Sequence, residues 1–299
     1  MSTDLSRSPF TSSLRWRALL AVMGLLLAAP ALAGSAETLR ATYAASTARL
    51  HDSPFHRPLY LESAESSGTL KGEIYAEVDR PFEVVKAALA SPDHWCEVLI
   101  LHPNTAQCRA QAGGASLAVN LGRKFDQSIK DSYSAEFAFQ LAQSSEDFLE
   151  VRLDAPKGPV GTSNYRFLLE AMPVAGGRSF LHLAYSYSYG FTARLATQAY
   201  LSTKGSGKVG FTATGKGADG KPEYIGGLRG AVERNAMRYY LAIDAYLAEF
   251  AQPPQQRFER SLERWFDSIE QYPRQLKEED RAAYAAVKHG LYQRQVAAR

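Results

Sequence analysis

Two segments near the middle of the chain alternate apolar and polar residues so regularly that each is expected to form a one-sided strand. From Tyr133 to Ala142 every odd-numbered residue is apolar or aromatic, and the same pattern recurs between Ser179 and Tyr189. Successive side chains of a strand point to opposite faces of its sheet. Each segment therefore has one apolar face, and such faces require a sheet that wraps around a core or a cavity.

Further strands are expected on both sides of these segments. They fall at residues 57–64, 69–78, 105–110, 116–120, 148–153 and 163–170, and clusters of Gly, Pro and Ser separate them at hairpin spacing. This spacing favours a mainly antiparallel sheet.

A long helix is expected from about Tyr224 to Phe250. Its apolar residues recur at spacings of three and four, which gives one apolar stripe along the helix: Val232, Ala236, Tyr239, Tyr240, Ile243, Leu247 and Phe250. This stripe is the expected partner of the greasy face of the sheet.

The segment from Thr69 to Trp95 links these parts into a recognisable order. Its period changes from two to about 3.6 at Pro81, where a fixed φ and a missing N–H suit the first turn of a helix. Strand, short helices, many strands and a late long helix together resemble the START and polyketide-cyclase-like (SRPBCC) superfamily. The resemblance implies an α+β helix-grip fold, in which a curved sheet wraps around the long C-terminal helix.

The resemblance also implies a function, namely binding of a lipid or other hydrophobic small molecule between sheet and helix, with no cofactor. A sheet and a helix that pack without a void are the alternative. A Tyr hydroxyl or an Arg would hold the polar end of the ligand. The predicted ligand-binding residues are Phe137, Phe139, Tyr165, Tyr185, Tyr187, Tyr240 and Ile243.

The N-terminal 33 residues have the layout of a secretory signal peptide. Arg15 and Arg17 precede the apolar run 18–29, which Pro30 and the small-residue triplet 31–33 follow. Cleavage is expected after Ala33, which predicts a periplasmic or secreted protein. A retained membrane anchor is the alternative, but twelve apolar residues fall short of the roughly 20 that a spanning helix needs.

Removal of residues 1–33, which hold three Arg and one Asp, lowers the net charge from +3 to +3 − (3 − 1) = +1. A nearly neutral chain has no electrostatic footprint for nucleic acid. Residues 34–252 are expected to form the ligand-binding domain, with a leading helix at 36–50, and residues 253–299 a C-terminal helical hairpin.

The two cysteines, Cys96 and Cys108, are expected to form a disulfide after export, because an even pair around a short loop is a natural candidate in an oxidising compartment. His94 precedes Cys96 and His102 lies between the two cysteines, so the four residues form a ligand set that zinc or copper would accept. The set lacks the short arms that preorganise metal sites, so the prediction is a disulfide and no metal.

An insertion at about 191–223 departs from the pattern of the superfamily, with an extra helix at 191–203 and an extra arm at 208–214. Two runs, 205–210 and 215–220, match the dinucleotide pattern G-x-G-x-x-G by letter. Neither has the strand before it and the helix after it that the fingerprint needs, so both are interpreted as hairpin turns. A lid over the cavity is a further hypothesis for this segment.

The tail beyond Pro253 carries an apolar stripe on one side of a charged helix: Phe258, Leu262, Trp265, Phe266 and Ile269. The expected role of this stripe is docking on the domain. A contact site for a membrane or a protein partner, within residues 253–299, is the alternative.

Catalysis has little direct support, because neither a G-x-S-x-G elbow nor an H-E-x-x-H motif is found. His94, His182 and Arg166 are available polar residues, and Arg152 with Asp154 is interpreted as a surface ion pair. A cofactor-free cyclase-like enzyme and a non-catalytic assembly protein are therefore kept as alternatives to a binding protein.

Overall fold

The structure, a computed structural model, describes residues 35–111, 113–122, 125–201, 207–277 and 279–297. The predicted signal peptide lies outside these residues. No helix in the described part of the chain is long and apolar enough to cross a membrane.

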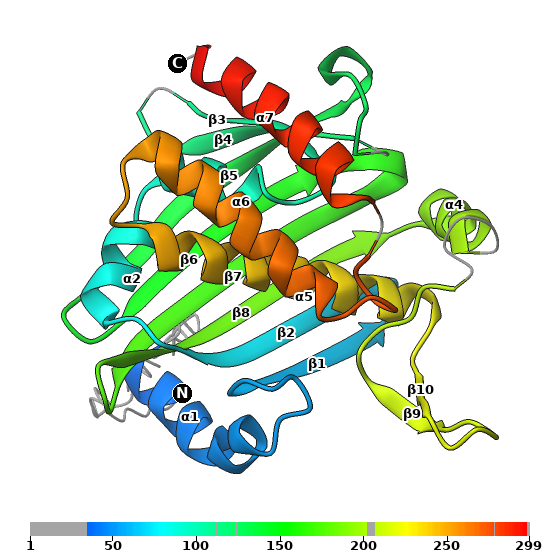
Figure 1. Cartoon of the computed structure of the whole chain (residues 1–299), viewed down its shortest axis with the longest axis horizontal. Helices are drawn as coiled ribbons and strands as arrows, with labels where there is room; N and C mark the ends of the chain where they lie inside the picture. Colours follow the sequence, from blue (N-terminus) through cyan, green and yellow to red (C-terminus); the bar gives the residue numbers. More distant parts are fainter. Residues whose placement is uncertain (1–34, 112, 123–124, 202–206, 278, 298–299) are drawn as a thin grey trace, which may run out of the picture. The chain divides into compact units, whose positions relative to one another are not determined.

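An eight-stranded antiparallel sheet dominates the domain (Figure 1). Its spatial order is β1-β2-β8-β7-β6-β5-β4-β3, so β1 lies at one edge and β2 pairs with β8, the last strand of this sheet along the chain. The strands are β1 Leu59–Ser66, β2 Thr69–Val78, β3 Thr105–Ala110, β4 Ser116–Leu121, β5 Tyr133–Ser144, β6 Leu149–Lys157, β7 Thr162–Val174 and β8 Arg178–Tyr189. Each predicted strand is found, and most boundary differences are extensions at strand ends.

Local sequence explains how the sheet is started and continued. Ser67 and Gly68 form a two-residue turn between β1 and β2, and both have positive φ, as a type I′ hairpin requires. Pro81 then precedes α2 (Phe82–Leu89), and Pro92 begins α3 (Pro92–Leu99). These two helices carry the chain from β2 to β3, which lies at the opposite edge of the sheet.

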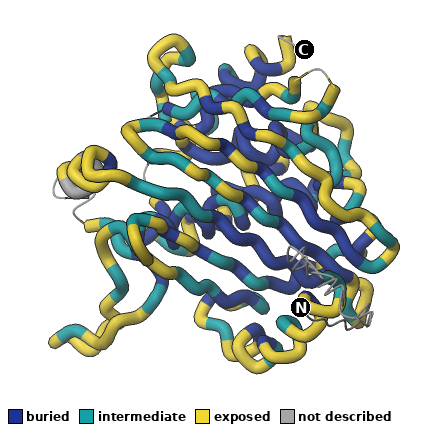
Figure 2. The backbone as a smooth tube through the Cα atoms, turned by 180° about the vertical axis from the view of Figure 1, so that it is seen from behind, coloured by how far each residue is buried: buried dark blue, intermediate teal, exposed yellow. Residues whose placement is uncertain are grey.

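The long helix α5 (Gly227–Glu249) packs on the face of the sheet formed by β1, β2 and β8 (Figure 1). Its inner residues belong to the main core, together with inward residues of the strands such as Leu181 and Leu183. The predicted α+β helix-grip arrangement is thus confirmed. Most of β8 is buried, whereas most of β5 and most of the described residues of α4 are exposed (Figure 2).

The C-terminal hairpin docks on the same side of the sheet as α5. Helix α6 (Pro254–Glu270) packs on α5, and α7 (Arg281–Ala297) contacts β3. The stripe predicted in α6 is buried throughout, and Trp265 stacks on Tyr284 of α7 at a centroid distance of 5.1 Å. The stripe is therefore not an exposed contact site, because its side chains are buried by packing within the domain.

Helix α1 (Ala36–His51) covers the opposite face of the sheet and builds a second core with it. Ser35 caps its first turn by accepting a hydrogen bond from the Thr38 N–H at 3.0 Å. Leu39 and Leu50 of the helix lie against Phe180 and other residues of that face. β8 is thus buried on both faces, which its alternating sequence did not indicate.

The insertion forms α4 (Phe191–Leu201) and an arm made of β9 (Ala213–Lys216) and β10 (Pro222–Tyr224). The run 215–220 begins in β9 and continues through the predicted hairpin turn, whereas part of the run 205–210 lies outside the described residues. Glu233 of α5 anchors the arm, because its carboxylate accepts hydrogen bonds from the N–H groups of Phe211 and Thr212. The arm borders a groove of about 550 Å³ beside β1 and α1.

Candidate functional site

A cavity of about 100 Å³ lies between α5 and the strands β3 to β8. Residues from the sheet, from α3 and the loop after it, and from α5 form its walls. They are Leu99, His102, Asn104, Thr105, Val119, Leu121, Gly122, Phe137, Leu153, Pro159, Tyr165, Phe167, Tyr185, Asn235 and Tyr239. Sheet and helix therefore do not pack without a void, although the void is small.

Aromatic rings make up the greasy part of the walls. Phe167 lies edge-on to Tyr239 at a centroid distance of 4.7 Å, and Tyr185 lies at 5.2 Å from the same ring. Phe137 completes the group, edge-on to Phe167 at 6.1 Å. The rings interlock and fill most of the space that the helix-grip arrangement encloses, which explains why the cavity is small.

The hydroxyl of Tyr165, one of the aromatic lining residues, is held by a hydrogen bond. The Tyr165 hydroxyl and the Thr162 hydroxyl are 2.8 Å apart and share a hydrogen bond. Gly158 lies against this ring, and a Cβ at that position would come within 2.1 Å of it. Residue 158 must therefore be glycine for Tyr165 to keep its place in the wall.

Polar side chains gather at one end of the cavity, where the chain passes from α3 into β3. His102, Asn104 and Thr105 line that end from the loop and the start of β3, and Asn235 lines it from α5. The β3–β4 register shifts between Thr105 and Gln107, which marks a β-bulge. Bulges change the direction of side chains locally, and this one lies directly beside Thr105.

The His102 ring is held from two sides. It stacks on Tyr239 at a centroid distance of 4.4 Å, and its Nδ1 accepts a hydrogen bond from the Asn104 N–H at 3.2 Å. Burial lowers the pKa of His102 well below its ordinary value, and the charges of Arg238 and Lys288 act in the same direction. A hydrogen bond with the Asn235 side chain opposes this shift without offsetting it, so the ring is neutral at pH 7.

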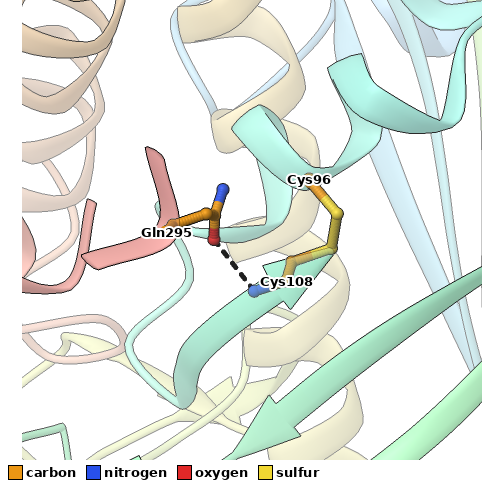
Figure 3. The surroundings of a disulfide bond; sticks show 3 residues. All are labelled: Cys96, Cys108 and Gln295. Atoms are coloured by element: carbon orange, nitrogen blue, oxygen red, sulfur yellow. Dashed lines mark hydrogen bonds between the residues drawn. A yellow bond between two sulfur atoms is a disulfide. The ribbon is translucent and has the colours of Figure 1, made fainter. Parts of the chain in front are cut away.

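The segment 101–108, which carries the polar end, is fixed by a disulfide. Cys96 of α3 and Cys108 of β3 are joined, with their Cα atoms 5.0 Å apart (Figure 3). The predicted disulfide is confirmed, and the alternative metal site is not formed by these residues. His102, considered above as a metal ligand, lines the cavity instead.

Helix α7 holds the same segment through its main chain. The Tyr284 hydroxyl donates to the Leu101 carbonyl at 2.5 Å, and Lys288 Nζ donates to the carbonyls of His102 and Thr105 at 2.6 and 2.8 Å. Gln295 accepts from the Cys108 N–H at 2.9 Å (Figure 3). The C-terminal hairpin is therefore part of the support of the cavity.

The structure brings together three of the seven predicted ligand-binding residues, because Phe137, Tyr165 and Tyr185 all line the cavity. Tyr187 stacks on Tyr165 at 5.2 Å, one ring beyond the wall, and Phe139 packs at the edge of the core. Neither is a lining residue.

The two predicted residues of α5 also lie elsewhere. Tyr240 is buried beside Arg57, with which it interacts, and Ile243 is buried in the main core. Asn235 and Tyr239 line the cavity in their place. Adjacent helical residues point about 100° apart, so a stripe that is correct for packing does not tell which of two neighbouring tyrosines faces the void.

Among the lining residues that were missed, Phe167 carried a usable signal, since it shares a strand face with Tyr165 two residues earlier. His102 and Thr105 carried none, because a loop and a bulge position them. No arginine lines the cavity in the described part of the chain, so of the two residue types expected to hold the polar end of a ligand only tyrosine is present. His102 and Thr105 are further polar lining residues. The arm also contributes no lining residue, which gives the lid hypothesis no support.

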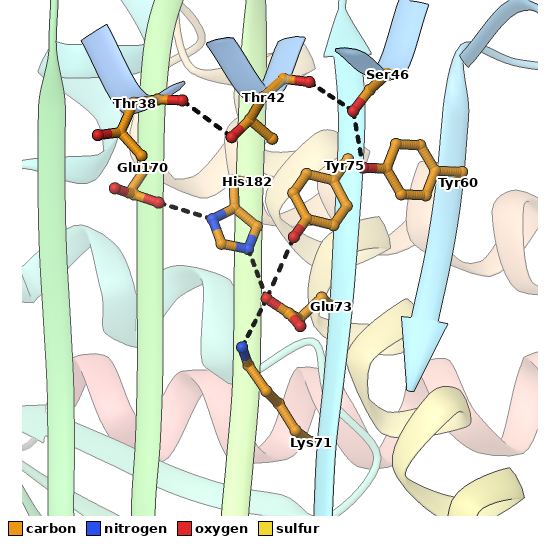
Figure 4. Close-up of polar contacts among 9 residues, drawn as sticks. All are labelled: Thr38, Thr42, Ser46, Tyr60, Lys71, Glu73, Tyr75, Glu170 and His182. Atoms are coloured by element: carbon orange, nitrogen blue, oxygen red, sulfur yellow. Dashed lines mark hydrogen bonds and ion pairs between the residues drawn. The ribbon is translucent and has the colours of Figure 1, made fainter. Parts of the chain in front are cut away.

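A second polar cluster lies on the other face of the sheet, under α1 (Figure 4). His182 bridges two carboxylates, with Nδ1 at 2.7 Å from Glu170 and Nε2 at 3.1 Å from Glu73. Lys71 adds an ion pair to Glu73 at 2.8 Å. These contacts join β7, β8 and β2 across the sheet.

The protonation of this cluster follows from its contacts. Burial alone would lower the pKa of His182, but hydrogen bonds to Glu170 and Glu73 raise it above its ordinary value. Burial alone would raise the pKa of Glu73, but hydrogen bonds from His182 and Lys71 lower it to about 2. Since none of these residues lines the cavity, the cluster is interpreted as a structural tie of the sheet.

The remaining polar candidates also have structural partners. His94 Nδ1 lies 3.1 Å from the Ala88 carbonyl, outside the cavity. The expected ion pair of Arg152 with Asp154 is wrong: Arg152 pairs with Glu150 at 2.5 Å, and Arg166 lies 3.9 Å from Asp154. The β6–β7 register explains the second pair, because it places Asp154 opposite Arg166.

No model of a known protein family matches this chain, and no curated protein matches its sequence. Similar solved structures include Ara h 8.0201, at 11% identity and a TM-score of 0.36, covering 60% of this chain and 99% of that chain. Norcoclaurine synthase from Thalictrum flavum has 12% identity and a TM-score of 0.32, covering 46% and 82%. A conserved protein of unknown function from Enterococcus faecalis has 8% identity and a TM-score of 0.33, covering 73% and 92%. These values are too low to support an argument about function.

Proposed function

We propose that this chain is an exported protein that binds a small hydrophobic molecule in the cavity between α5 and the sheet. The observation that carries the proposal is the cavity itself, with its walls of Phe137, Phe167, Tyr185 and Tyr239. Interiors are normally close-packed, so an aromatic-lined void with a few polar groups at one end is the usual form of a ligand pocket.

The volume narrows the class of ligand. A cavity of about 100 Å³ is somewhat smaller than an engineered apolar cavity of about 150 Å³ that accommodates benzene. Pockets for drug-sized ligands measure roughly 300–1,000 Å³. The proposed ligand is therefore no larger than a single unsubstituted ring, and a substituted ring or a lipid with full acyl chains would need the aromatic walls to separate.

Export is proposed from the sequence of residues 1–33, which has the layout of a signal peptide. The disulfide between Cys96 and Cys108 is consistent with an oxidising compartment such as the periplasm. Sequencing of the N-terminus of the protein isolated from its host tests this part. A chain that starts near Gly34 supports export, and a chain that starts at Met1 refutes cleavage.

Binding is tested with benzene, an apolar ring of six heavy atoms, by isothermal titration and ligand-observed NMR. At roughly 0.5 kcal/mol per heavy atom, the expected Kd is on the order of 1–10 mM. Val119→Phe adds a ring to the cavity wall and should abolish binding, whereas Val119→Ala enlarges the cavity and should retain it. Equal binding by the two variants, or none by the unaltered protein, would refute the proposed site.

Native mass spectrometry with organic extraction of the protein purified from its host then identifies the natural occupant. A co-purifying ring-sized compound supports a binding protein. A product that changes chemically during incubation with the protein would instead favour the cyclase-like alternative.

A further inference from the structure

Strand β1 forms one edge of the eight-stranded sheet, so half of its main-chain groups face away from β2 (Figure 1). In an antiparallel pair, successive residues direct their N–H and C=O groups alternately to the partner strand and to the opposite side. Ser53 donates to the Leu59 carbonyl at 2.5 Å, and Arg229 donates to the Ser63 carbonyl at 2.9 Å. The odd-numbered residues of β1 therefore face the free edge, and side chains already bond two of their carbonyls.

Leu61 lies between these two positions and has its main-chain groups open. In the described part of the chain, no residue is hydrogen-bonded to its N–H or its carbonyl oxygen. Open groups at a sheet edge can pair with a further strand. Leu61 also lines the groove of about 550 Å³ beside β1 and α1, a volume within the range of ligand pockets. This groove is called the edge groove below.

The edge groove crosses from one face of the sheet to the other. Its apolar lining includes residues from β1, the loop before it and the arm: Phe55, Tyr60, Leu61, Phe211, Ala213 and Tyr224. Phe55 and Phe211 belong to the main core on the α5 side, whereas Tyr60 belongs to the second core under α1. A strand added beside β1 would place side chains on both of these faces. The edge groove shares no lining residue with the cavity under α5.

Two charged residues line the edge groove in the described part of the chain, Arg49 and Asp52. Arg49 pairs with Glu62 at 2.6 Å, and its guanidinium lies over the Tyr60 ring at 3.9 Å. The Asp52 carboxylate is exposed and forms no ion pair with a described residue. On the α1 side, the groove therefore favours a cationic side chain.

Two other occupants fit less well. A second copy of this chain presents the same recessed edge, and two grooves of one shape cannot fill each other. The first residues of the proposed mature chain lie at the far end of α1, a helix of 16 residues and therefore about 24 Å in length, whereas the edge groove is at its last turn.

We propose that the edge groove binds an extended segment of a partner protein, which pairs antiparallel with β1 as an additional edge strand. Its central residue is apolar, exchanges two hydrogen bonds with Leu61 and packs against Phe55 and Phe211. A Lys or Arg next to this residue points to the α1 side and pairs with Asp52. This interaction surface is separate from the proposed ligand cavity.

The blocked peptide acetyl-Thr-Lys-Val-Lys-Thr-amide tests the inference by titration against the full protein with its disulfide intact. N-methylation of the valine removes the donor to the Leu61 carbonyl, and it should weaken binding by roughly tenfold. N-methylation of the second lysine is the matched control, because the N–H of that residue points away from β1. It should leave the Kd unchanged.

Two substitutions test the lining of the groove. Ala48 is an exposed lining residue of α1, so Ala48→Trp should block the groove and abolish binding of the peptide. Ala41→Trp makes the same change at an exposed position roughly two turns earlier in α1 and should retain binding. Asp52→Asn should weaken the lysine peptide by roughly two- to fivefold, but not a peptide with glutamine in place of both lysines.

Amide hydrogen exchange of the unaltered protein follows the proposed bonds directly, also where a variant does not fold. The Leu61 N–H should exchange fast in the free protein and slowly with the peptide bound. The Glu62 N–H, which faces β2, should be protected in both states. Protection of Leu61 in the free protein would overturn the inference, because it would show that the edge is already occupied.

The remaining outcomes are equally clear. Absence of peptide binding, fast exchange of Leu61 in the complex, or equal binding after N-methylation of the valine would each overturn the inference. A dimer in sedimentation that Ala48→Trp dissociates would assign the edge groove to a second copy instead. An Asp52→Asn variant with unchanged affinity would overturn the cationic part of the assignment. Benzene binding in the cavity is a separate measurement, so the proposed function stands or fails independently.

Discussion

Lys288 of α7 gives the sharpest test of how the tail supports the cavity. It is fully buried, and no described carboxylate forms an ion pair with it. Its Nζ donates to the carbonyls of His102 and Thr105. Burial lowers its pKa from an ordinary 10.5 to about 7. The prediction is that this one residue makes the free energy of unfolding depend on pH.

The sign follows from proton binding in the two states. Between pH 7 and 10.5 the unfolded chain holds a proton on Lys288 that the folded chain lacks, so stability increases with pH in this window. Above pH 10.5 both states are neutral, and below pH 7 both are charged. The slope is about 1.4 kcal/mol per pH unit, so the effect between pH 7.5 and 9.5 is at most about 3 kcal/mol.

The assay compares urea unfolding of the unaltered protein and of Lys288→Met at pH 7.5, 8.5 and 9.5. Other titrating groups affect both proteins alike, so the difference between the two free energies isolates Lys288. That difference should change by 2–3 kcal/mol in favour of the unaltered protein as the pH rises, on the linkage argument above (about 1.4 kcal/mol per unit). A difference that is constant with pH would refute the reasoning, because it would mean that Lys288 keeps its ordinary pKa in the folded state.

Three further predictions concern other parts of the domain. Glu73→Gln should lower the free energy of unfolding at pH 7 by about 2 kcal/mol, since the depressed pKa of Glu73 contributes stability above pH 4.5 that is lost towards pH 2; unchanged acid unfolding would contradict this. Replacing Cys96 and Cys108 with Ser should cost about 3 kcal/mol in urea unfolding, because the unfolded chain regains the freedom of a short loop. Val160→Gly should raise the free energy of unfolding by about 0.5–1 kcal/mol, and with it the melting temperature, since Val160 has a φ of 57° that a β-branched residue disfavours. A lower melting temperature would show that the Val160 side chain contributes more stability than the backbone strain costs.

The order of strands and helices was readable from the sequence because alternation and stripes are local signals. The strand predicted at Thr69 to Val78 and the turn at Ser67 and Gly68 illustrate this, since the residues that define them also form them. The sequence did not show which face of the sheet α1 covers. Its inner surface carries hydroxyl groups such as Thr42 and Ser46, which bond back to the helix, and this leaves only a weak apolar stripe.

The sequence predicted a cavity between sheet and helix, but only some of the residues that line it. Strand parity placed Phe137 and Tyr185 correctly, because a period of two admits only two answers. His102 and Thr105 depend on a loop, a bulge and three side chains of α7 that lie more than 170 residues away in the sequence. Such long-range support leaves no local pattern, so sequence reasoning could not find the polar end.

Four hydrogen bonds from α7 to the segment 101–108 end on main-chain atoms. Tyr284 and Lys288 bind carbonyl oxygens, and Gln295 binds an N–H group. Every residue type has these groups, apart from the N–H that proline lacks. The tail thus fixes the path of the segment through groups that do not depend on residue type. Because His102, Asn104 and Thr105 of this segment line the cavity, the tail helps to set the shape of the cavity without lining it.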